Sequence, residues 1–434
     1  MSDDPPETLR YSLEQWPPPL ATLLLSLQWL AALLPGLLVL GDVVGAAQGL
    51  AGAERLAFLQ RLLLMAGLVQ VAQVLLGHRL PGLVGPSAVL LVGVLGTLGA
   101  GPAAVYGAMA AGGLLAALTG ATGLAGRLGR LYTPPVLAST LLLLIISLAP
   151  TMRDQMFDPG PGPGTPARAF TFALGLTLAM FWAQQRLKGL LSSAVLLLGM
   201  LLGSAAYYLL GLGGLPLGAP TAGWGLGLPG LAPVELSLEP GVVAAFAVCY
   251  LALVANELAS VEALGPLTGA GQMPRRSSRA VLVSGLGGLL AGLWGVPGPV
   301  TYSVSPGVLF ASKSASRWTL LPAAGLLVLL ALWPDGLAVA RLAPPAVVGA
   351  VLFALMANSA YAALHLLDSR PGGLDMGSGL VVGVSITAGL VVTFMAPEVR
   401  LSLPRLIRPI LANGFVVGLA LALIMEHLVL ARRR

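Results

Sequence analysis

The chain has 434 residues, of which 57% are hydrophobic and only 9% charged, and its mean hydropathy is +0.90. Because a soluble domain carries roughly 25% charged residues, this composition excludes an ordinary soluble protein and predicts a polytopic membrane protein. The net charge of +6 comes from 23 basic and 17 acidic side chains, and their distribution over loops explains it better than a nucleic-acid partner would.

The N-terminal sequence and the single cysteine argue against a signal peptide, an intramolecular disulfide and a cysteine metal site. The sequence MSDDPPETLRYSLEQWPPPL is acidic and proline-rich, unlike the basic start and apolar core of a signal peptide. We therefore expect residues 1–19 to form a short cytoplasmic tail. Cys249 is the only cysteine and lies inside an apolar run, which leaves no intramolecular disulfide or cysteine metal site.

A membrane crossing needs about 20 apolar residues, and this requirement predicts two sets of seven segments separated by a loop rich in glycine and proline. The first set lies near residues 20–41, 56–77, 84–95, 98–120, 133–150, 168–186 and 190–212. The second set lies near residues 241–265, 279–296, 303–312, 318–334, 344–366, 377–396 and 407–430.

An odd number of segments in each half predicts an inverted repeat, because the second half must enter the membrane in the opposite orientation. The third segment of each half is short and begins near helix breakers, GPS at 85–87 and SPG at 305–307. Such breakers predict half-helices preceded by extended chain, with two N-terminal ends directed at one site within the membrane. The alternative is that these residues only kink two ordinary spans.

The basic residues indicate the orientation. With the N-terminus inside, 15 of the 23 lysines and arginines fall in cytoplasmic loops or ends, and 8 fall on the opposite side. The positive-inside rule therefore predicts that both termini are cytoplasmic. A cluster of Arg400, Arg405 and Arg408 runs against this bias, which an interfacial segment would explain.

One carboxyl group lies deep in an apolar run. Of the 17 acidic residues, 14 fall in tails or loops and Glu426 lies close to a helix end, which leaves Glu257 and Glu262 within a predicted span. Five helical residues separate these two by about 140° of rotation. Glu262 is nearer the cytoplasmic end, so Glu257 is the group at membrane depth, where a carboxylate is costly and usually faces a cavity. Tyr250 and Ser260 lie on its side of the helix and extend a polar line.

The burial of Glu257 suggests a function. Exclusion from water favours the uncharged carboxyl group, so we expect Glu257 to exchange a proton near neutral pH as a substrate comes and goes. The alternative is a protonated side chain that bonds to a neighbouring helix and serves only packing.

Four stretches of sequence carry a resemblance to a known family. They are SLQWL at 26–30, LPGLVG at 80–85, the run from Arg279 to Trp318, and the final span with the pair Asn413-Gly414. In this order, and with two inverted sets of seven spans, the chain resembles the nucleobase:cation symporter family of uracil and xanthine permeases and of nucleobase or ascorbate carriers. The resemblance covers nearly the whole chain.

The resemblance implies an all-α, uracil permease-like fold of fourteen spans. A core domain would comprise residues 20–130 and 241–342, and a gate domain residues 131–240 and 343–434. The substrate would bind between the two domains, at the half-helices. The family carboxylate that binds the base and is tied to proton coupling maps onto Glu257, and Tyr302, in the pair Thr301-Tyr302, falls on an aromatic position of the tenth span. A homodimer through the gate domains is also implied.

Three positions depart from the family pattern. Val304, between Ser303 and Ser305, replaces a Glu, Gln or Asn that pairs with the edge of the base. Ala88 replaces a frequent aromatic residue on the first half-helix, and Trp29 replaces a histidine. A base without its second side-chain partner would leave hydrogen-bond donors poorly satisfied, so discrimination among nucleobases should suffer.

Weaker candidates surround the predicted site. Gln28 either bonds to the substrate from the first span or bonds to a neighbouring helix. Ser87 and Ser305 lie at the starts of the half-helices, where capping serines are favoured with or without a ligand. The backbone near Ser87, Ala88 and residues 303–305 is predicted to donate to the substrate. The histidines lie at span ends, at positions 78, 365 and 427, which predicts neither a metal site nor a proton relay.

Two transport functions follow. The leading hypothesis is proton-coupled uptake of a nucleobase or related small polar solute by alternating access in the cell (inner) membrane, with Glu257 as the carboxylate for substrate and proton. The alternative is an anion carrier resembling the sulfate permeases, which share this fold, because two positive helix ends suit an anion. An ionised Glu257 opposes that alternative. No enzyme activity, cofactor or metal is predicted.

Overall fold

The computed structural model describes residues 9–161, 163–214, 227, 230–231, 233–340, 342–368, 375–404 and 407–430. The first eight residues of the predicted tail and most of residues 215–232 in the predicted dividing loop lie outside this part of the chain. So do Arg341, Arg370, Arg405 and residues 431–434, and with them six of the 23 basic residues whose distribution predicts the orientation.

Helices dominate both halves, and many begin with proline at the first helical position, where the missing N–H group is not needed. The first half contains α1 (Pro19–Ala47), α2 (Gly52–Leu75), β1 (Val84–Pro86), α3 (Ala88–Thr97), η1 (Leu98–Ala100), α4 (Pro102–Ala121), α5 (Ala125–Gly129), α6 (Pro134–Phe157), α7 (Pro166–Arg186), α8 (Leu190–Ser193) and α9 (Val195–Leu209).

The second half repeats this order. It contains α10 (Pro240–Thr268), α11 (Met273–Trp294), β2 (Pro299–Thr301), α12 (Ser305–Ser312), η2 (Arg317–Thr319), α13 (Leu320–Ala331), α14 (Pro334–Ala340), α15 (Pro345–Asp368), α16 (Met376–Thr393), α17 (Pro397–Ser402), α18 (Arg408–Leu411), α19 (Gly414–Ile424) and η3 (Met425–Val429). Each of the fourteen predicted segments coincides with a helix, and nine helices of the described residues are long and apolar enough to cross a membrane. The predicted all-α polytopic fold is confirmed.

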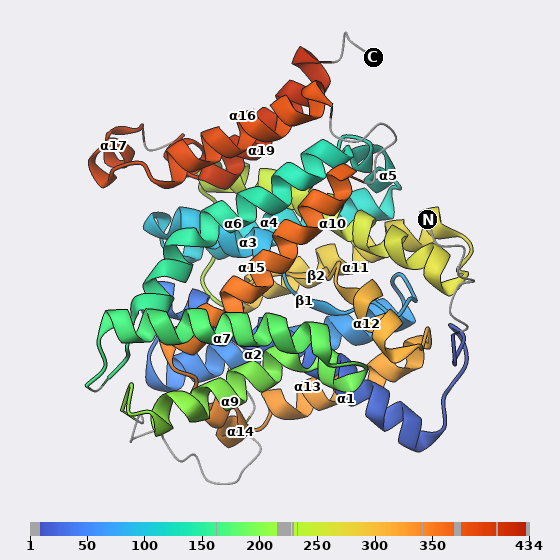
Figure 1. Ribbon diagram of the computed structural model, residues 1–434. Helices are drawn as coiled ribbons and strands as arrows, with labels where there is room; N and C mark the ends of the chain where they lie inside the picture. Colours follow the sequence, from blue (N-terminus) through green and yellow to red (C-terminus); the bar gives the residue numbers. More distant parts are fainter. Residues whose placement is uncertain are drawn as a thin grey trace.

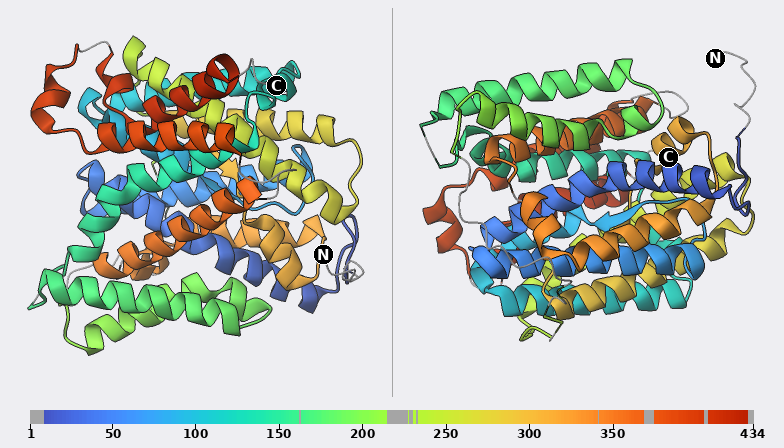
Figure 2. Two further views of the ribbon diagram at one scale, coloured as in Figure 1. Left: turned by 45° about the horizontal axis from the view of Figure 1, so that its top comes forward. Right: turned by 90° about the horizontal axis from the view of Figure 1, so that it is seen from below.

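The helices pack as two groups, and each group contains helices from both halves of the chain. In the first group, α4 packs against α11 and α2 packs against α13, while α3 contacts α10 and α1 contacts α12. In the second group, α6 and α15 pack against each other, with α7 and α9 at one end and α16 and α19 at the other (Figures 1 and 2). These contacts form pairs related by exchange of the two halves: α4 with α11 corresponds to α13 with α2, and α3 with α10 corresponds to α12 with α1, as an inverted repeat requires.

The two short helices follow a two-stranded ribbon near the middle of the molecule (Figure 1). Strands β1 and β2 are antiparallel, and Val84 pairs with Thr301 while Pro86 pairs with Pro299. Because α3 continues from β1 and α12 continues from β2, the two helices leave the ribbon in opposite directions and direct their N-terminal ends toward its centre. The predicted half-helices preceded by extended chain are confirmed, and the alternative of two kinked spans is excluded.

Glycine allows α4 and α11 to touch along their backbones. A methyl group added to Gly285 would lie 2.3 Å from the backbone nitrogen of Ala117, and one added to Gly113 would lie 2.3 Å from that of Leu289. Small residues at such a contact give close van der Waals packing between membrane helices, for which lipid offers no hydrophobic driving force. The first group therefore has a tightly packed centre.

The N-terminal segment is anchored beside the second half-helix. Residues 10–15 run along the loop after α12: the backbone N–H of Arg10 donates to the carbonyl of Lys313 at 2.7 Å, and that of Ala315 donates to Tyr11 at 2.9 Å. The Arg317 guanidinium donates to the Glu14 carboxylate at 2.7 Å and to the carbonyl of Val74, at the end of α2, at 2.6 Å. This segment thus joins the chain start to the first group of helices.

Candidate functional site

Glu257 lies in α10 beside the end of β2 and is fully buried. The backbone N–H of Thr301 donates to its Oε2 at 2.7 Å, and the Thr301 hydroxyl donates to its Oε1 at 2.6 Å. A carboxylate at membrane depth is tolerated when such donors replace water. Glu257 therefore faces the broken backbone of the second half-helix rather than lipid.

Gln73 of α2 completes the surroundings of this carboxylate. Its Nε2 donates to Glu257 Oε1 at 3.3 Å and, at 2.9 Å each, to the carbonyl of Ala280 and the hydroxyl of Ser284 in α11. Its Oε1 accepts from the backbone N–H of His78 at 3.2 Å. Helices α2, α10 and α11 and strand β2 thus meet in one buried hydrogen-bond network around the Glu257 carboxylate.

Tyr302 lies across the ribbon, partly buried. Its hydroxyl donates to the carbonyl of Pro86 at 3.1 Å, and its backbone N–H donates to the carbonyl of Leu83 at 2.7 Å. The ring passes close to Gly85, where an added methyl group would lie 2.5 Å from the Tyr302 hydroxyl oxygen. Glycine at this position therefore allows an aromatic side chain of the second half to rest on the extended chain of the first half.

The two serines at the half-helix starts have different roles. Ser87 is the N-cap of α3, and its hydroxyl accepts from the backbone N–H of Leu90 at 3.4 Å, as predicted. The prediction that Ser305 caps α12 is wrong, because the N-cap residue is Val304 and no side chain caps this helix. The Ser305 hydroxyl instead accepts from the N–H of Leu83 at 3.0 Å and donates to the carbonyl of Tyr302, which binds the two strands together.

The remaining predicted residues lie around the ribbon at different depths. Ser303 and Val304 are exposed, Val304 by 47%, so the position that lacks the family's polar residue is open. Ala88 is partly buried at the start of α3. Gln28 is buried in α1, a helix that packs against β1 and α12.

The polar line predicted along α10 does not extend from Glu257 as a bonded chain. Tyr250 packs against glycines of α4 and α11, where a methyl group on Gly112 would lie 2.2 Å from its ring. The side-chain oxygens of Tyr250 and Ser260 are buried and have no hydrogen-bond partner in the described structure. Tyr250 thus fills space between helices and does not bond to the Glu257 carboxylate.

His78 ends the network on the side of the loop between α2 and β1. It is fully buried; its Nδ1 accepts from the backbone N–H of Leu80 at 2.9 Å, and its carbonyl accepts from the Arg276 guanidinium at 2.9 Å. Burial, helped by the positive charge of Arg276, lowers the pKa of the His78 imidazole to about 3. His78 is therefore a neutral structural residue.

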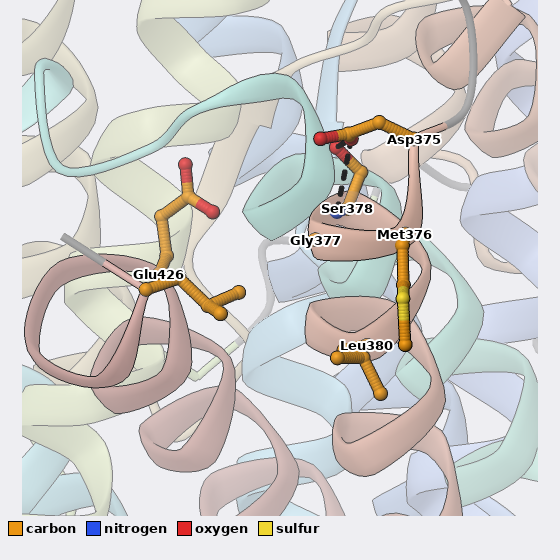
Figure 3. Close-up of a pocket in the computed structure, with 7 residues that line it drawn as sticks. Asp375, Met376, Gly377, Ser378, Leu380 and Glu426 are labelled. Atoms are coloured by element: carbon orange, nitrogen blue, oxygen red, sulfur yellow. Dashed lines mark hydrogen bonds between the residues drawn. The ribbon is translucent and has the colours of Figure 1, made fainter. Parts of the chain in front are cut away.

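A separate pocket of about 370 Å³ lies between the start of α16 and η3 and contains none of the predicted site residues (Figure 3). Asp375 caps α16 by accepting from the backbone N–H of Ser378 at 3.0 Å and from the Ser378 hydroxyl. Glu426 lies across the pocket from Asp375. The cap explains the place of Asp375, and the pocket lies apart from the site around Glu257.

Sequence reasoning missed Gln73 and Thr301. Gln70 and Gln73 form a pair of amides within an apolar span, and amides at membrane depth usually bond to neighbouring helices or to backbone. Gln70 does so, because its Oε1 accepts from Val84 at 2.8 Å and its Nε2 donates to Gly82 at 2.9 Å. Two amides within an apolar span could therefore have predicted buried hydrogen bonds at Gln70 and Gln73, but not which residues accept or donate them.

The arrangement defines a class of protein. A buried carboxylate at the point where two opposed half-helices begin, inside a two-group bundle of inverted repeats, is the plan of a secondary carrier. Comparison with known proteins agrees: residues 20–398 match the model of the permease family that includes the xanthine and uracil permeases. The chain belongs to this family, and is a multi-pass membrane permease rather than an enzyme.

The similarity to individual relatives extends over almost the whole chain. It is 27% identical over 430 residues to the nucleobase transporter PlUacP of Paenibacillus larvae, covering 95% of each chain. It is 28% identical over 411 residues to the uric acid permease PucK of Bacillus subtilis, covering 92% of this chain and 93% of that one.

Solved structures share the fold at lower sequence identity. The transmembrane domain of a cyanobacterium bicarbonate transporter, BicA, matches with a TM-score of 0.60 at 18% identity, covering 94% of this chain and 96% of that one. The murine solute carrier 26 family member A9 anion transporter, in the inward-facing state, matches with a TM-score of 0.60 at 13% identity, covering 98% of this chain and 70% of that one.

Proposed function

We propose that this permease takes up a nucleobase, of the uracil, xanthine or uric acid type, together with protons. The observation that carries the proposal is the buried Glu257 carboxylate, held where the chain enters the second half-helix. The similarity to a nucleobase transporter and a uric acid permease over more than nine-tenths of the chain supports the choice of substrate. Glu257 is assigned to proton coupling, and Tyr302 is assigned to packing beside the base.

The proposed mechanism is alternating access, in which the gate domain moves against the core around the ribbon. The exposed start of α12, at Ser303 and Val304, would receive the substrate together with the chain at Ser87 and Ala88. Gln28 would line the same site from α1. We further propose a homodimer through the gate domains, an inner-membrane location and cytoplasmic termini, on the family resemblance and the distribution of basic residues.

Transport by purified protein in liposomes tests this function. Radiolabelled uracil, xanthine and uric acid are supplied with and without an imposed proton gradient, to wild type and to Glu257→Gln and Glu257→Ala. We expect the gradient to drive accumulation of at least one base by wild type and by neither variant. Proton-driven accumulation by Glu257→Ala would remove Glu257 from the mechanism, and no uptake of any base by wild type would reject the nucleobase assignment.

An anion carrier is the second candidate, and the geometry of Glu257 favours it more than the sequence did. Because Thr301 donates hydrogen bonds to both carboxylate oxygens, these donors offset part of the Glu257 charge, which would repel an anion at the exposed start of α12 less than a carboxylate without such donors would. Adding sulfate, bicarbonate or a dicarboxylate to the liposome uptake assay separates the candidates, because only the true substrate competes.

A further inference from the structure

Thr301 is the residue that bonds to both oxygens of Glu257. It ends β2, is fully buried, and supplies one backbone and one side-chain donor to the carboxylate, at 2.7 and 2.6 Å. The bond from Gln73 is longer, at 3.3 Å, and the same amide nitrogen serves two further acceptors. The short, charge-assisted bonds to Glu257 therefore come from Thr301.

The register of the ribbon leaves the Thr301 amide free to point at α10. Thr301 faces Val84, and the neighbouring ladder bonds run from Tyr302 to Leu83 and from Ser87 to Gly298. In an antiparallel pair, residues between such bonds direct their N–H groups away from the partner strand. The outward amide of Val84 meets a neutral acceptor, the Gln70 side chain, whereas that of Thr301 meets the ionisable Glu257.

The other groups that face Glu257 carry no charge. Gln73 and Ser284 are neutral, and His78, whose backbone N–H donates to Gln73, is neutral because burial lowers the pKa of its imidazole to about 3. Arg276 bonds to the carbonyl of His78. Tyr302 bonds through its hydroxyl to Pro86. Hydrogen bonds, rather than a counter-charge, thus stabilise an ionised Glu257, and a bond donated to the charged form favours that form.

We propose that Thr301 is a positioning residue for proton coupling: its hydroxyl holds the Glu257 carboxylate and sets the pH at which this carboxylate takes up its proton. The proposal rests on the proposed proton-coupled function. Loss of the hydroxyl would remove the shortest of the bonds to the carboxylate and leave the backbone N–H of Thr301, the long bond from Gln73 and the Ser284 hydroxyl, so Glu257 would keep its proton to higher pH.

The test is the pH dependence of uptake in liposomes by wild type, Thr301→Val and Thr301→Ser. Valine has the shape of threonine and keeps the methyl group that lies beside Gly82, but it lacks the hydroxyl. We expect the alkaline decline of uptake to shift upward by about one to two pH units in Thr301→Val, from the energy of a hydrogen bond to a charged group. Thr301→Ser should restore the wild-type midpoint.

A matched control removes a buried hydroxyl elsewhere. Thr177 in α7 is 1% exposed, and its hydroxyl donates to the carbonyl of Ala173 at 2.8 Å. Thr177→Val should leave the pH midpoint unchanged. An equal shift in Thr177→Val, or an unchanged midpoint in folded Thr301→Val, would overturn the proposal.

Infrared titration gives a readout that does not depend on transport. The carboxyl stretching band of Glu257 is identified by its loss in Glu257→Gln and is followed with pH in wild type and in the Thr301 variants. If Thr301→Val does not fold, Thr301→Ala is measured in the same way. A band midpoint that moves upward without the hydroxyl supports the proposal even if no nucleobase is transported, whereas an unmoved midpoint rejects it even if uptake is proton-driven.

Discussion

The hydroxyl of Tyr302 donates to the carbonyl of Pro86 at 3.1 Å, and the ring passes over Gly85 closely enough to exclude any side chain there. This contact joins the second half-helix of the chain to the extended segment of the first. It also makes Gly85 a means of displacing Tyr302 without altering the tyrosine itself.

Gly85→Ala should weaken substrate binding. The added methyl group would lie 2.5 Å from the Tyr302 oxygen, so the ring must move and the bond to Pro86 must break. If Tyr302 packs beside the base, we expect the KM for uptake to rise about tenfold, equivalent to about 1.4 kcal/mol. Gly99→Ala is the control, because nothing lies within 4 Å of a methyl group at that position. An unchanged KM in Gly85→Ala would separate Tyr302 from the substrate site.

Val304→Gln should sharpen selection among nucleobases. Val304 is 47% exposed at the start of α12, so a longer polar side chain has room to reach a bound base. One added hydrogen bond would improve the affinity for the matching base by about tenfold, about 1.4 kcal/mol, and would not improve it for bases that lack the matching edge. Competition for uptake measures this, with Val304→Leu as the apolar control. Identical preferences in both variants would contradict the prediction.

Arg317→Ala should destabilise the protein by about 2 kcal/mol, because the guanidinium is largely buried and donates both to Glu14 and to the carbonyl of Val74. Glu14→Gln should cost less than about 1 kcal/mol, since the Glu14 side chain is 58% exposed. Denaturant unfolding of purified protein compares the two variants. Equal losses would show that the ion pair, and not the bond to the end of α2, anchors the N-terminal segment.

His78 should make the protein less stable in mild acid. Its pKa is lowered to about 3, so between about pH 6.5 and pH 3 the unfolded chain binds a proton that the folded chain does not. Stability from this group therefore falls as the pH falls, by about 2 kcal/mol between pH 8 and pH 5. Asparagine at position 78 can accept from Leu80 through Oδ1 but does not titrate. We expect the stability difference between wild type and His78→Asn to change by this amount over that range; a constant difference would show that His78 protonates while folded.

Features that depend on local sequence were predictable. Apolar length located all fourteen helical segments, and the glycine, proline and serine of residues 85–87 located the break before α3, because these residues act on their own backbone. Ser87 caps α3 for the same local reason. Glu257 was also accessible from sequence, because an acidic residue in an apolar run is conspicuous whatever surrounds it.

Features that depend on packing were not predictable. The hydrogen-bond partners of Glu257 lie 44 and 184 residues away in sequence, at Thr301 and Gln73. The sequence around each of these residues gives no indication that they are in contact. Ser305 was expected to cap α12, but the approach of Leu83 on the neighbouring strand offers its hydroxyl a different partner. The pairing of strands from opposite halves decides both outcomes.

The antiparallel ribbon also constrains how the molecule can move. Backbone bonds from Tyr302 to Leu83 and from Ser87 to Gly298, together with the Ser305 hydroxyl, join the two strands. A displacement of either short helix must therefore carry the other with it, and Glu257 follows through Thr301. If the proposed alternating access operates, the ribbon, the starts of both half-helices and Glu257 would move as one rigid body, and the two openings would differ in the helices that surround this body and not in its internal geometry.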